Sequence, residues 1–241
     1  MHQVVTTFLS PHDFRVAFPN VWAGFQVNLK LMVVAEALVL VFALAVAVVR
    51  GLPGRGARPL RALMIVYTDF FRGTPLILVA FVIGFGLPAL SVHAISNRSN
   101  FTYGVIALTL VYTAYVTEVY RAGIESVHPS QRMAARSLGL SYGQSMRHVV
   151  VPQAVRRVIP PLLNDFIGLQ KDTALVSVIG VAEAALQAQG YSQTYANFTS
   201  YTVAAVLFVL LTIPLARFTD HLILVRERRE RAARAPGSGD R

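Results

Sequence analysis

A set of charged residues lies inside or at the ends of long apolar stretches, where a charge is costly unless it is paired or faces water. They are Lys30, Glu36, Arg72, Glu118, Lys171 and Asp172. Charges in such places either hold the opposite charges of a solute or pair with one another across helices. The sequence leaves both interpretations open, and neither makes the chain a catalyst.

No other residues are arranged for catalysis or for metal binding. The chain has no cysteine, which excludes a disulfide framework, a thiolate nucleophile and a cysteine-based metal site. Its histidines are scattered without metal-ligand spacing, and no nucleophile has a base and an acid placed to form a triad. A phosphate-binding GxxxxGK[ST] loop is also missing from the sequence. We therefore expect this chain to bind no cofactor and no metal.

The elements that position these charges are predicted to be those of a membrane protein, because the composition is strongly apolar. Of 241 residues, 54% are hydrophobic and 14% are charged, and the mean hydropathy is +0.53, which is too apolar for an ordinary soluble domain. About 20 apolar residues cross a bilayer as a helix. The stretches that qualify are 24–49, 61–90, 103–120, 158–180 and 201–224. The predicted fold is an all-α polytopic membrane protein with about five transmembrane helices.

The arginines set the orientation of these spans, because basic connections stay in the cytoplasm. Nearly all of them follow the first span, the third span or the last span, whereas the other connections contribute only Arg15 and Arg98. The predicted topology has the amino terminus outside and the carboxyl terminus inside. Since the basic residues alternate with apolar runs, the net charge of +10 does not indicate a nucleic-acid partner.

The chain divides into three predicted parts. Residues 1–23 form an outer segment that lies in the bilayer interface or packs against the bundle. Residues 24–226 form the transmembrane domain, and residues 227–241 form a flexible basic cytoplasmic tail. Because the number of spans is odd and no repeat is visible, a second copy or a homologue must complete any pathway across the membrane.

The cytoplasmic connection 122–157, between the third and fourth spans, is too long to lack structure of its own. Pro129 suits the first turn of a helix, and Gly139 suits the left-handed residue that ends one. Ser141 and Gln144 form a capping-box pattern that begins a second helix, which we expect to end at Pro152. The predicted structure is a helix, a tight turn and a helix.

The first helix of this pair carries small residues between charges. Ala134 and Ala135 are flanked by Arg132 and Arg136, which would let the helix enter a groove of a partner protein. A solvated amphipathic hairpin lying on the membrane accounts for the same pattern equally well.

The run from Glu118 to Leu162 resembles the signature loop of ATP-binding-cassette import permeases. In that loop Glu-Ala-Ala, three residues, Gly, nine residues, Ile, one residue and Leu-Pro recur, and this spacing is kept here. The matching residues are Ala134, Ala135, Gly139, Val149, Val151 and Pro152. Met133 stands where the family usually has glutamate, so we expect the helix but not the salt bridge that this acid would make.

Two further stretches, 69–76 and 169–183, are similar to the polar amino-acid branch of these permeases, which includes histidine, glutamine, glutamate and arginine importers. The resemblance implies a multi-pass subunit of the bacterial cytoplasmic membrane that transports a polar amino acid by alternating access. The implied partners are a cytoplasmic ATPase dimer that binds ATP and Mg, a second permease copy or homologue, and an extracytoplasmic solute-binding protein. ATP hydrolysis would belong to the ATPase and not to this chain.

The resemblance also assigns candidate residues. Those implied in coupling to the ATPase are Ser130, Arg132, Met133, Ala134, Ala135, Arg136, Gly139, Val151 and Pro152. A zwitterionic amino acid needs counter-charges or helix ends for its carboxylate and its ammonium group. Proline and glycine at 72–75 break the second span and leave backbone groups free. Candidates for the substrate pathway are Asn28, Arg72, Gly73, Thr74, Pro75, Glu118, Asn164, Lys171, Asp172 and Thr173.

Two other functions compete with the importer. In a channel or ion-coupled carrier, Glu118, Lys171 and Asp172 would form a proton relay. A membrane-embedded enzyme is the third possibility. The long basic connection 122–157 favours the importer, because a self-contained carrier or enzyme needs no dock for an ATPase.

Overall fold

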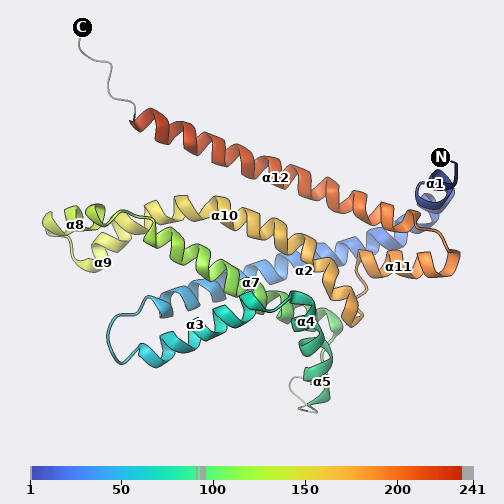
Figure 1. Ribbon diagram of the computed structural model, residues 1–241, viewed down its shortest axis with the longest axis horizontal. Coiled ribbons are helices and arrows are strands. Elements are labelled where there is room, and N and C mark those ends of the chain that lie inside the picture. The colour runs from blue at the N-terminus through green and yellow to red at the C-terminus, as the bar shows by residue number, and fades with distance from the viewer. Residues whose placement is uncertain (1, 91, 93–95, 235–241) are drawn as a thin grey trace, which may run out of the picture.

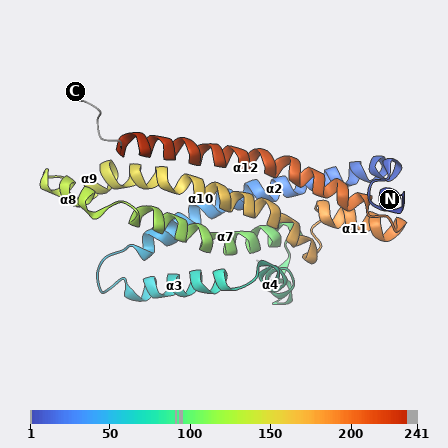
Figure 2. The same ribbon diagram turned by 45° about the horizontal axis from the view of Figure 1, so that its top comes forward.

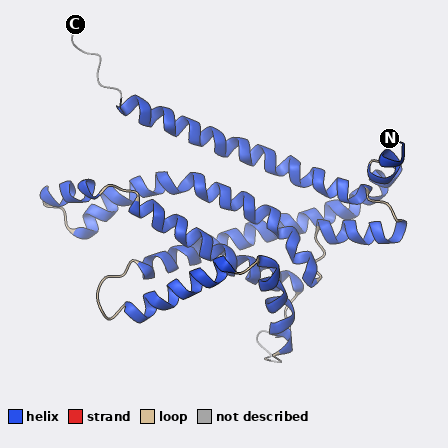
Figure 3. Ribbon diagram, viewed as in Figure 1, coloured by secondary structure: helices blue, strands red, loops and turns tan. Residues whose placement is uncertain are grey.

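The computed structural model describes residues 2–90, 92 and 96–234, and this part of the chain forms helices and no strand (Figure 3). The α-helices are α1 His2–Phe8, α2 Pro11–Arg50, α3 Arg58–Gly73, α4 Leu76–Phe81, α5 Leu87–Ala89, α7 Asn100–Glu125, α8 Pro129–Ser137, α9 Tyr142–Ser145, α10 Val151–Asp172, α11 Ala184–Tyr195 and α12 Thr199–Arg234. The π-helical turns η1 Val82–Gly86 and η2 Met146–Val150 and the 3₁₀ turn η3 Thr173–Ile179 join some of them.

The predicted all-helical membrane fold is confirmed, and the number of spans is confirmed in part. Within the described residues, three helical stretches are long and apolar enough to cross a membrane: Gln3–Arg50, Asn100–Glu125 and Thr199–Val225. The pair Arg58–Gly73 and Leu76–Ala89, bent by 107°, makes a fourth if it is one span. The remaining predicted span, 158–180, is helical in α10 and η3 but does not meet the same test. The fifth span therefore stays a prediction.

The long helices lie side by side (Figures 1 and 2). Helix α7 packs against α2, α3 and α10, and α12 lies along α2 and α10. The basic segments gather at one end of this bundle, where Figure 1 shows the loop between α2 and α3, the α8–α9 hairpin and the far end of α12. This gathering agrees with the alternation of arginines along the sequence.

The largest core lies between α2, α4, α7, α10 and η3. Leu31, Val39, Leu108, Leu169 and Val176 are fully buried in it. Many large apolar side chains point away from this core instead, such as those on the outer faces of α2, α3 and α12. An apolar outer surface of this extent is stable in hydrocarbon and not in water.

The amino-terminal segment packs against the bundle through the start of α12. Phe198 N donates to Thr7 O at 2.9 Å, and Ser10 N donates to Thr199 Oγ1 at 3.1 Å. Asn197 Nδ2 adds a bond of 3.1 Å to an Asp13 oxygen. The amino-terminal segment thus contacts the bundle, and the rings of Phe14, Phe18 and Trp22 stack along one half-exposed face of α2. Whether this segment also lies in the bilayer interface stays a prediction.

The predicted limits of the parts fall within helices. Helix α2 runs without a break through residue 23, and α12 runs to Arg234, past the predicted start of the tail at 227. Arginine, glutamate and alanine at that end are good helix formers, which accounts for the extension. Residues 235–241, the rest of the predicted tail, lie outside the described residues.

The predicted end of the second hairpin helix at Pro152 is wrong. From Tyr142 the chain stays helical through α9, η2 and α10 to Asp172. Pro152 is the second residue of α10, directly after the π-helical turn Met146–Val150. A proline is tolerated in the first turn of an α-helix because its missing N–H group is not needed there.

Candidate functional site

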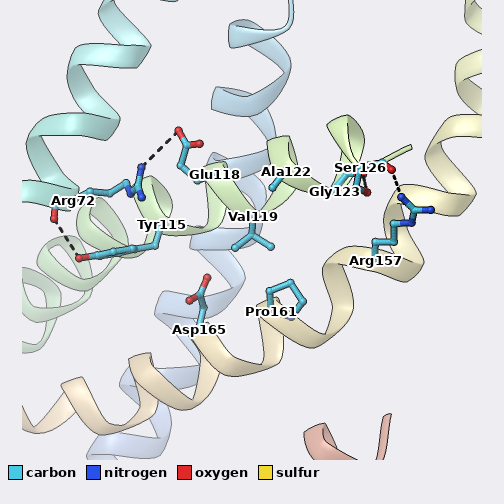
Figure 4. Close-up of a pocket in the computed structure, with 10 residues that line it drawn as sticks. All are labelled: Arg72, Tyr115, Glu118, Val119, Ala122, Gly123, Ser126, Arg157, Pro161 and Asp165. Carbon is cyan, nitrogen blue, oxygen red and sulfur yellow. Dashed lines mark hydrogen bonds and ion pairs between the residues drawn. The ribbon is translucent and has the colours of Figure 1, made fainter. Parts of the chain in front are cut away.

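A cleft of about 690 Å³ opens between α3, α7 and α10 (Figure 4). Its polar lining consists of Arg72, Tyr115, Glu118, Ser126, Arg157 and Asp165. Predicted pathway residues therefore meet in it from two elements, Arg72 from α3 and Glu118 from α7. The predicted helix break positions one of them, because α3 ends at Gly73, directly after Arg72.

The break at 72–75 is confirmed. Thr74 is extended, with φ −101° and ψ 127°, and Pro75 precedes the first residue of α4. Side chains bond two of the carbonyl groups near the end of α3. Thr74 Oγ1 donates to Phe70 O at 2.8 Å, and Tyr115 OH donates to Arg72 O at 3.3 Å. The bend thus places Arg72 at the edge of the cleft with its carbonyl oxygen held by α7.

Glu118 lies at the centre of an arginine cluster. Its carboxylate accepts hydrogen bonds from Arg50 Nη1 and, at 3.0 Å, from Arg121 Nε. Arg72 Nη1 lies 4.0 Å from Glu118 Oε1. The arginines come from three different helices, α2, α3 and α7, so Glu118 joins these helices at one edge of the cleft. A carboxylate with this many cations has no need of a solute's ammonium group.

A second polar cluster is closed to solvent. Asn28 Nδ2 donates to Thr173 Oγ1 at 3.0 Å and to Glu183 Oε2 at 2.9 Å, and Asn28 Oδ1 accepts from Ala184 N at 3.0 Å. Asn28 is 2% exposed, and Thr173 and Glu183 are fully buried. The Glu183 carboxylate also caps α11 by accepting from two backbone N–H groups, at 2.9 and 2.8 Å. We call Asn28, Thr173 and Glu183 the buried lock.

The remaining pathway candidates lie along α10. Asp172 Oδ2 accepts a hydrogen bond of 2.8 Å from Tyr112 OH on α7. Asn164 and Lys171 are exposed. The predicted pathway residues thus divide among the cleft, the buried lock and the surface of α10.

Several residues of these clusters were not among the predicted site candidates. Asp165 and Tyr115 line the cleft, and Glu183 completes the lock. A signal for Asp165 existed, since it follows Asn164 within an otherwise apolar segment. Glu183 carried no comparable signal, because its partner Asn28 is 155 positions away in the sequence.

The hairpin of α8 and α9 projects from the end of the bundle (Figure 1). Gly139 ends α8 in the left-handed conformation, with φ 82°, and Leu140 N donates to Ala135 O at 3.2 Å. Both halves of the predicted capping box of Ser141 and Gln144 are present. The turn of the hairpin and the start of its second helix are therefore as predicted.

The exposed surface of the hairpin is basic and apolar. Met133 and Leu138 are 62% and 83% exposed, whereas Ala135 is 4% exposed. The other candidates of the hairpin and the start of α10 that are exposed are Ser130, Ala134, Arg136, Gly139, Val151 and Pro152. Arg132 is half-buried, with a buried Nε that has no hydrogen-bond partner. Only one of the two predicted alanines, Ala134, thus belongs to the outer surface.

Membrane-crossing helices, a charged cleft between them and a basic hairpin at one end define an integral membrane transport component. Comparison with known proteins gives the family. The chain belongs to the binding-protein-dependent transport system inner membrane components, whose family model matches residues 51–224.

Relatives of this family align over most of the chain. The probable glutamine ABC transporter permease protein GlnM of Bacillus subtilis is 38% identical over 83% of this chain and 89% of its own length. The glutamate transport system permease protein GluC of Corynebacterium glutamicum is 35% identical over 82% and 90%. The arginine transport system permease protein ArtQ of Bacillus subtilis is 32% identical over 83% and 91%.

Solved structures agree with these relatives. A chain of a crystal structure titled as an amino acid ABC transporter with histidines superposes with a TM-score of 0.78 at 34% identity, covering 88% of this chain and 94% of that one. A chain of the MetNI methionine ABC transporter, at 17% identity and a TM-score of 0.69, covers 90% and 99% and shares the fold.

Proposed function

We propose that this chain is the membrane-spanning subunit of an ATP-driven importer that moves a polar amino acid into a bacterial cell. The exposed α8–α9 hairpin carries the proposal, because it presents the family's coupling-loop spacing at the basic end of the bundle. The names of the glutamine, glutamate and arginine relatives support an amino-acid substrate. The basic end would face the cytoplasm, with five spans and the amino terminus outside.

The proposed assembly contains partners that supply what this chain lacks. A cytoplasmic ATPase dimer would bind ATP and Mg and hydrolyse the nucleotide. A second copy or homologue of this chain would form the other half of the pathway, and an extracytoplasmic binding protein would deliver the substrate. The competing proton relay is not favoured by the contacts, since Glu118 is neutralised by arginines and Lys171 is exposed on α10.

The hairpin is joined to the cleft through α10. Val127, Val150 and Ala154 form a small buried cluster at the base of the hairpin. Arg157 Nη1 donates to Ser126 O, which fastens α10 to the end of α7. A shift of α8 by the ATPase would therefore move α10 as a unit with it and change the cleft that α10 borders.

Gly139→Val tests the coupling. An added Cβ meets nothing within 4 Å, and the left-handed backbone costs a residue with a Cβ about 1–2 kcal/mol within the hairpin. The protein should insert normally while ATP hydrolysis no longer drives uptake in proteoliposomes. Gly143→Val is the matched control, because a Cβ there also meets nothing and its φ is not positive. Normal coupling in the Gly139 variant would refute the proposal for the hairpin.

Arg72→Ala and Lys171→Ala test the pathway. Arg72 lies at the cleft and Lys171 on the surface of α10. If Arg72 holds the substrate carboxylate, its removal should raise the apparent KM for uptake. Unchanged affinity and rate in both variants would leave these charges with a structural role only.

A further inference from the structure

A groove of about 340 Å³ lies at the end of the bundle opposite the basic hairpin (Figure 1). It is bordered by α1, by the first turns of α2 and by the start of α12. Its apolar lining consists of Phe8, Leu9, Pro11, Phe14 and Val206. The walls are fastened to one another, because Ser10 N is bonded to Thr199 and the ring of Phe8 stacks on that of Phe198 with centroids 5.6 Å apart. The groove is therefore a built part of the fold.

The mouth of the groove is surrounded by exposed apolar side chains. Phe8, Leu9, Phe14 and Val206 are all exposed. Val206 lies about two turns inside Thr199–Val225, one of the stretches that can cross a membrane. Apolar surface at this depth is stable beside lipid and not beside water. The groove thus opens where the hydrocarbon of the bilayer meets the headgroups.

Arg15 is the charged residue of the groove. Among the described residues that line it, no other is basic or acidic. Arg15 is exposed and takes part in none of the ion pairs found in the described part of the chain. The nearest acid in the sequence, Asp13, accepts hydrogen bonds from Tyr191 OH at 2.7 Å and from Asn197 Nδ2 at 3.1 Å instead. Residues two apart on a helix do not face each other.

An unpaired guanidinium group at the edge of the hydrocarbon is costly unless it reaches an anion. Lipid phosphates are the anions at that depth. A guanidinium group suits them, because its planar fork can donate two parallel hydrogen bonds to one phosphate. An apolar groove with one free arginine at its mouth therefore has the two features that match a phospholipid.

We propose that this groove binds one anionic phospholipid, with its phosphate on Arg15 and part of an acyl chain between α1, α2 and α12. Because no acid lines the described part of the groove, the ammonium group of a zwitterionic lipid has no partner there. A headgroup with a net negative charge, such as that of phosphatidylglycerol, is favoured for this reason. The proposal goes beyond the proposed function and does not depend on what the chain transports.

The test uses the complete transporter, purified in detergent and stripped of lipid. A phosphatidylglycerol that carries a photoactivatable group on one acyl chain is the probe, and mass spectrometry measures the label on peptides that line the groove. Arg15→Gln should raise the probe concentration that half-saturates this label about tenfold, the loss expected for a charge-assisted hydrogen bond. Arg55→Gln makes the same charge change at an exposed site between α2 and α3 and should leave that concentration unchanged.

A second pair of variants tests the apolar part of the groove. Val206→Phe adds bulk to its wall and should lower the groove label at a fixed probe concentration. Val66→Phe adds the same bulk to an exposed valine of α3, outside the groove, and should leave the label unchanged. Both valines are exposed, so the Tm of the lipid-free variants should stay near that of wild type.

Unlabelled competitors identify the group that is recognised. Phosphatidylglycerol should displace the probe at a concentration about tenfold lower than phosphatidylethanolamine does, and inorganic phosphate should not displace it. Equal displacement by phosphatidylethanolamine, or displacement by phosphate alone, overturns the proposal.

Two other results would also overturn it: no label on the groove peptides, or wild-type labelling of the Arg15→Gln variant. If Arg15→Gln then weakened binding of the extracytoplasmic binding protein, the surface would be a protein dock instead. None of these measurements is of uptake, so the proposed function and the lipid site can fail separately.

Discussion

Replacing Asn28 with alanine should destabilise the protein by removing the centre of the buried lock. The substitution leaves the N–H group of Ala184 without an acceptor and takes one donor from the buried Glu183 carboxylate. An orphaned buried N–H group costs about 1–2 kcal/mol, and a hydrogen bond to a charged group contributes about 2 kcal/mol. Thr173 adds little to the loss, because its hydroxyl also donates to Gln170 O at 2.7 Å.

The expected loss is therefore about 3–4 kcal/mol, which corresponds to a fall in Tm of roughly 6–16 °C for a chain of this size. Thermal unfolding of the detergent-solubilised complex measures it. Gln26→Ala, an exposed amide on the same helix, is the matched control and should melt within about 1 °C of wild type.

The same experiment decides between the two roles open to Asn28. If it binds substrate, Asn28→Ala should impair uptake while Tm stays near that of wild type. That result would refute the structural reasoning. A large fall in Tm that the Glu183→Gln substitution does not add to would support it, since both changes break one cluster.

Three further substitutions test other contacts. Gly123→Ala should lower Tm by overpacking, at a cost of about 1–3 kcal/mol in the free energy of unfolding, because its Cβ would lie 2.1 Å from Val158 Cγ1. A second substitution in the same chain, Val158→Ala, should restore part of the loss, and a normal Tm in the single variant would contradict the packing. Glu118→Gln should lower the free energy of unfolding by about 1–3 kcal/mol, less than for a fully buried pair, because Arg50 loses its counter-charge while partly reached by solvent. Thermal unfolding at low and high salt measures the effect, and an unchanged Tm would contradict the role of Glu118 at the helix junction. Met133→Glu should leave Tm unchanged, because the side chain is 62% exposed, but strengthen retention of the ATPase during purification, because it restores the acid that the family usually has there; unaltered retention would show that this position does not contribute to docking.

The hairpin is the part of the site that the sequence predicts best. Its signals are local: Pro129, Gly139 and the Ser141 capping box each specify a backbone conformation within a few residues. The error at Pro152 arose because a proline that ends one helix and a proline in the first turn of the next look the same in a sequence. The structure distinguishes the two cases, because the π-helical turn Met146–Val150 leads directly into the first turn of α10, where Pro152 lies.

The cleft and the buried lock depend on contacts that no local pattern contains. Arg72 and Glu118 were found because charges in apolar stretches are conspicuous, and they do meet at the cleft. The roles of Asn28 and Glu183 were hidden, because hydropathy treats an amide in a span as a possible ligand whether its neighbours satisfy it or not. Where side chains from α2, α10 and α11 converge is a property of the packed bundle.

The contacts between the two ends of the chain have a consequence for biogenesis. Ser10 and Thr199, which are hydrogen-bonded, are separated by 189 positions. At a synthesis rate of about 5–20 residues per second, the amino-terminal segment waits roughly 10–40 s for its partner to leave the ribosome. During that interval the stacked rings of Phe14, Phe18 and Trp22 have only lipid and the insertion machinery to pack against. A ribosome that stalls before α12 would therefore release a chain whose amino-terminal segment lacks its hydrogen-bond partners, and we expect membrane proteases to cleave such a chain.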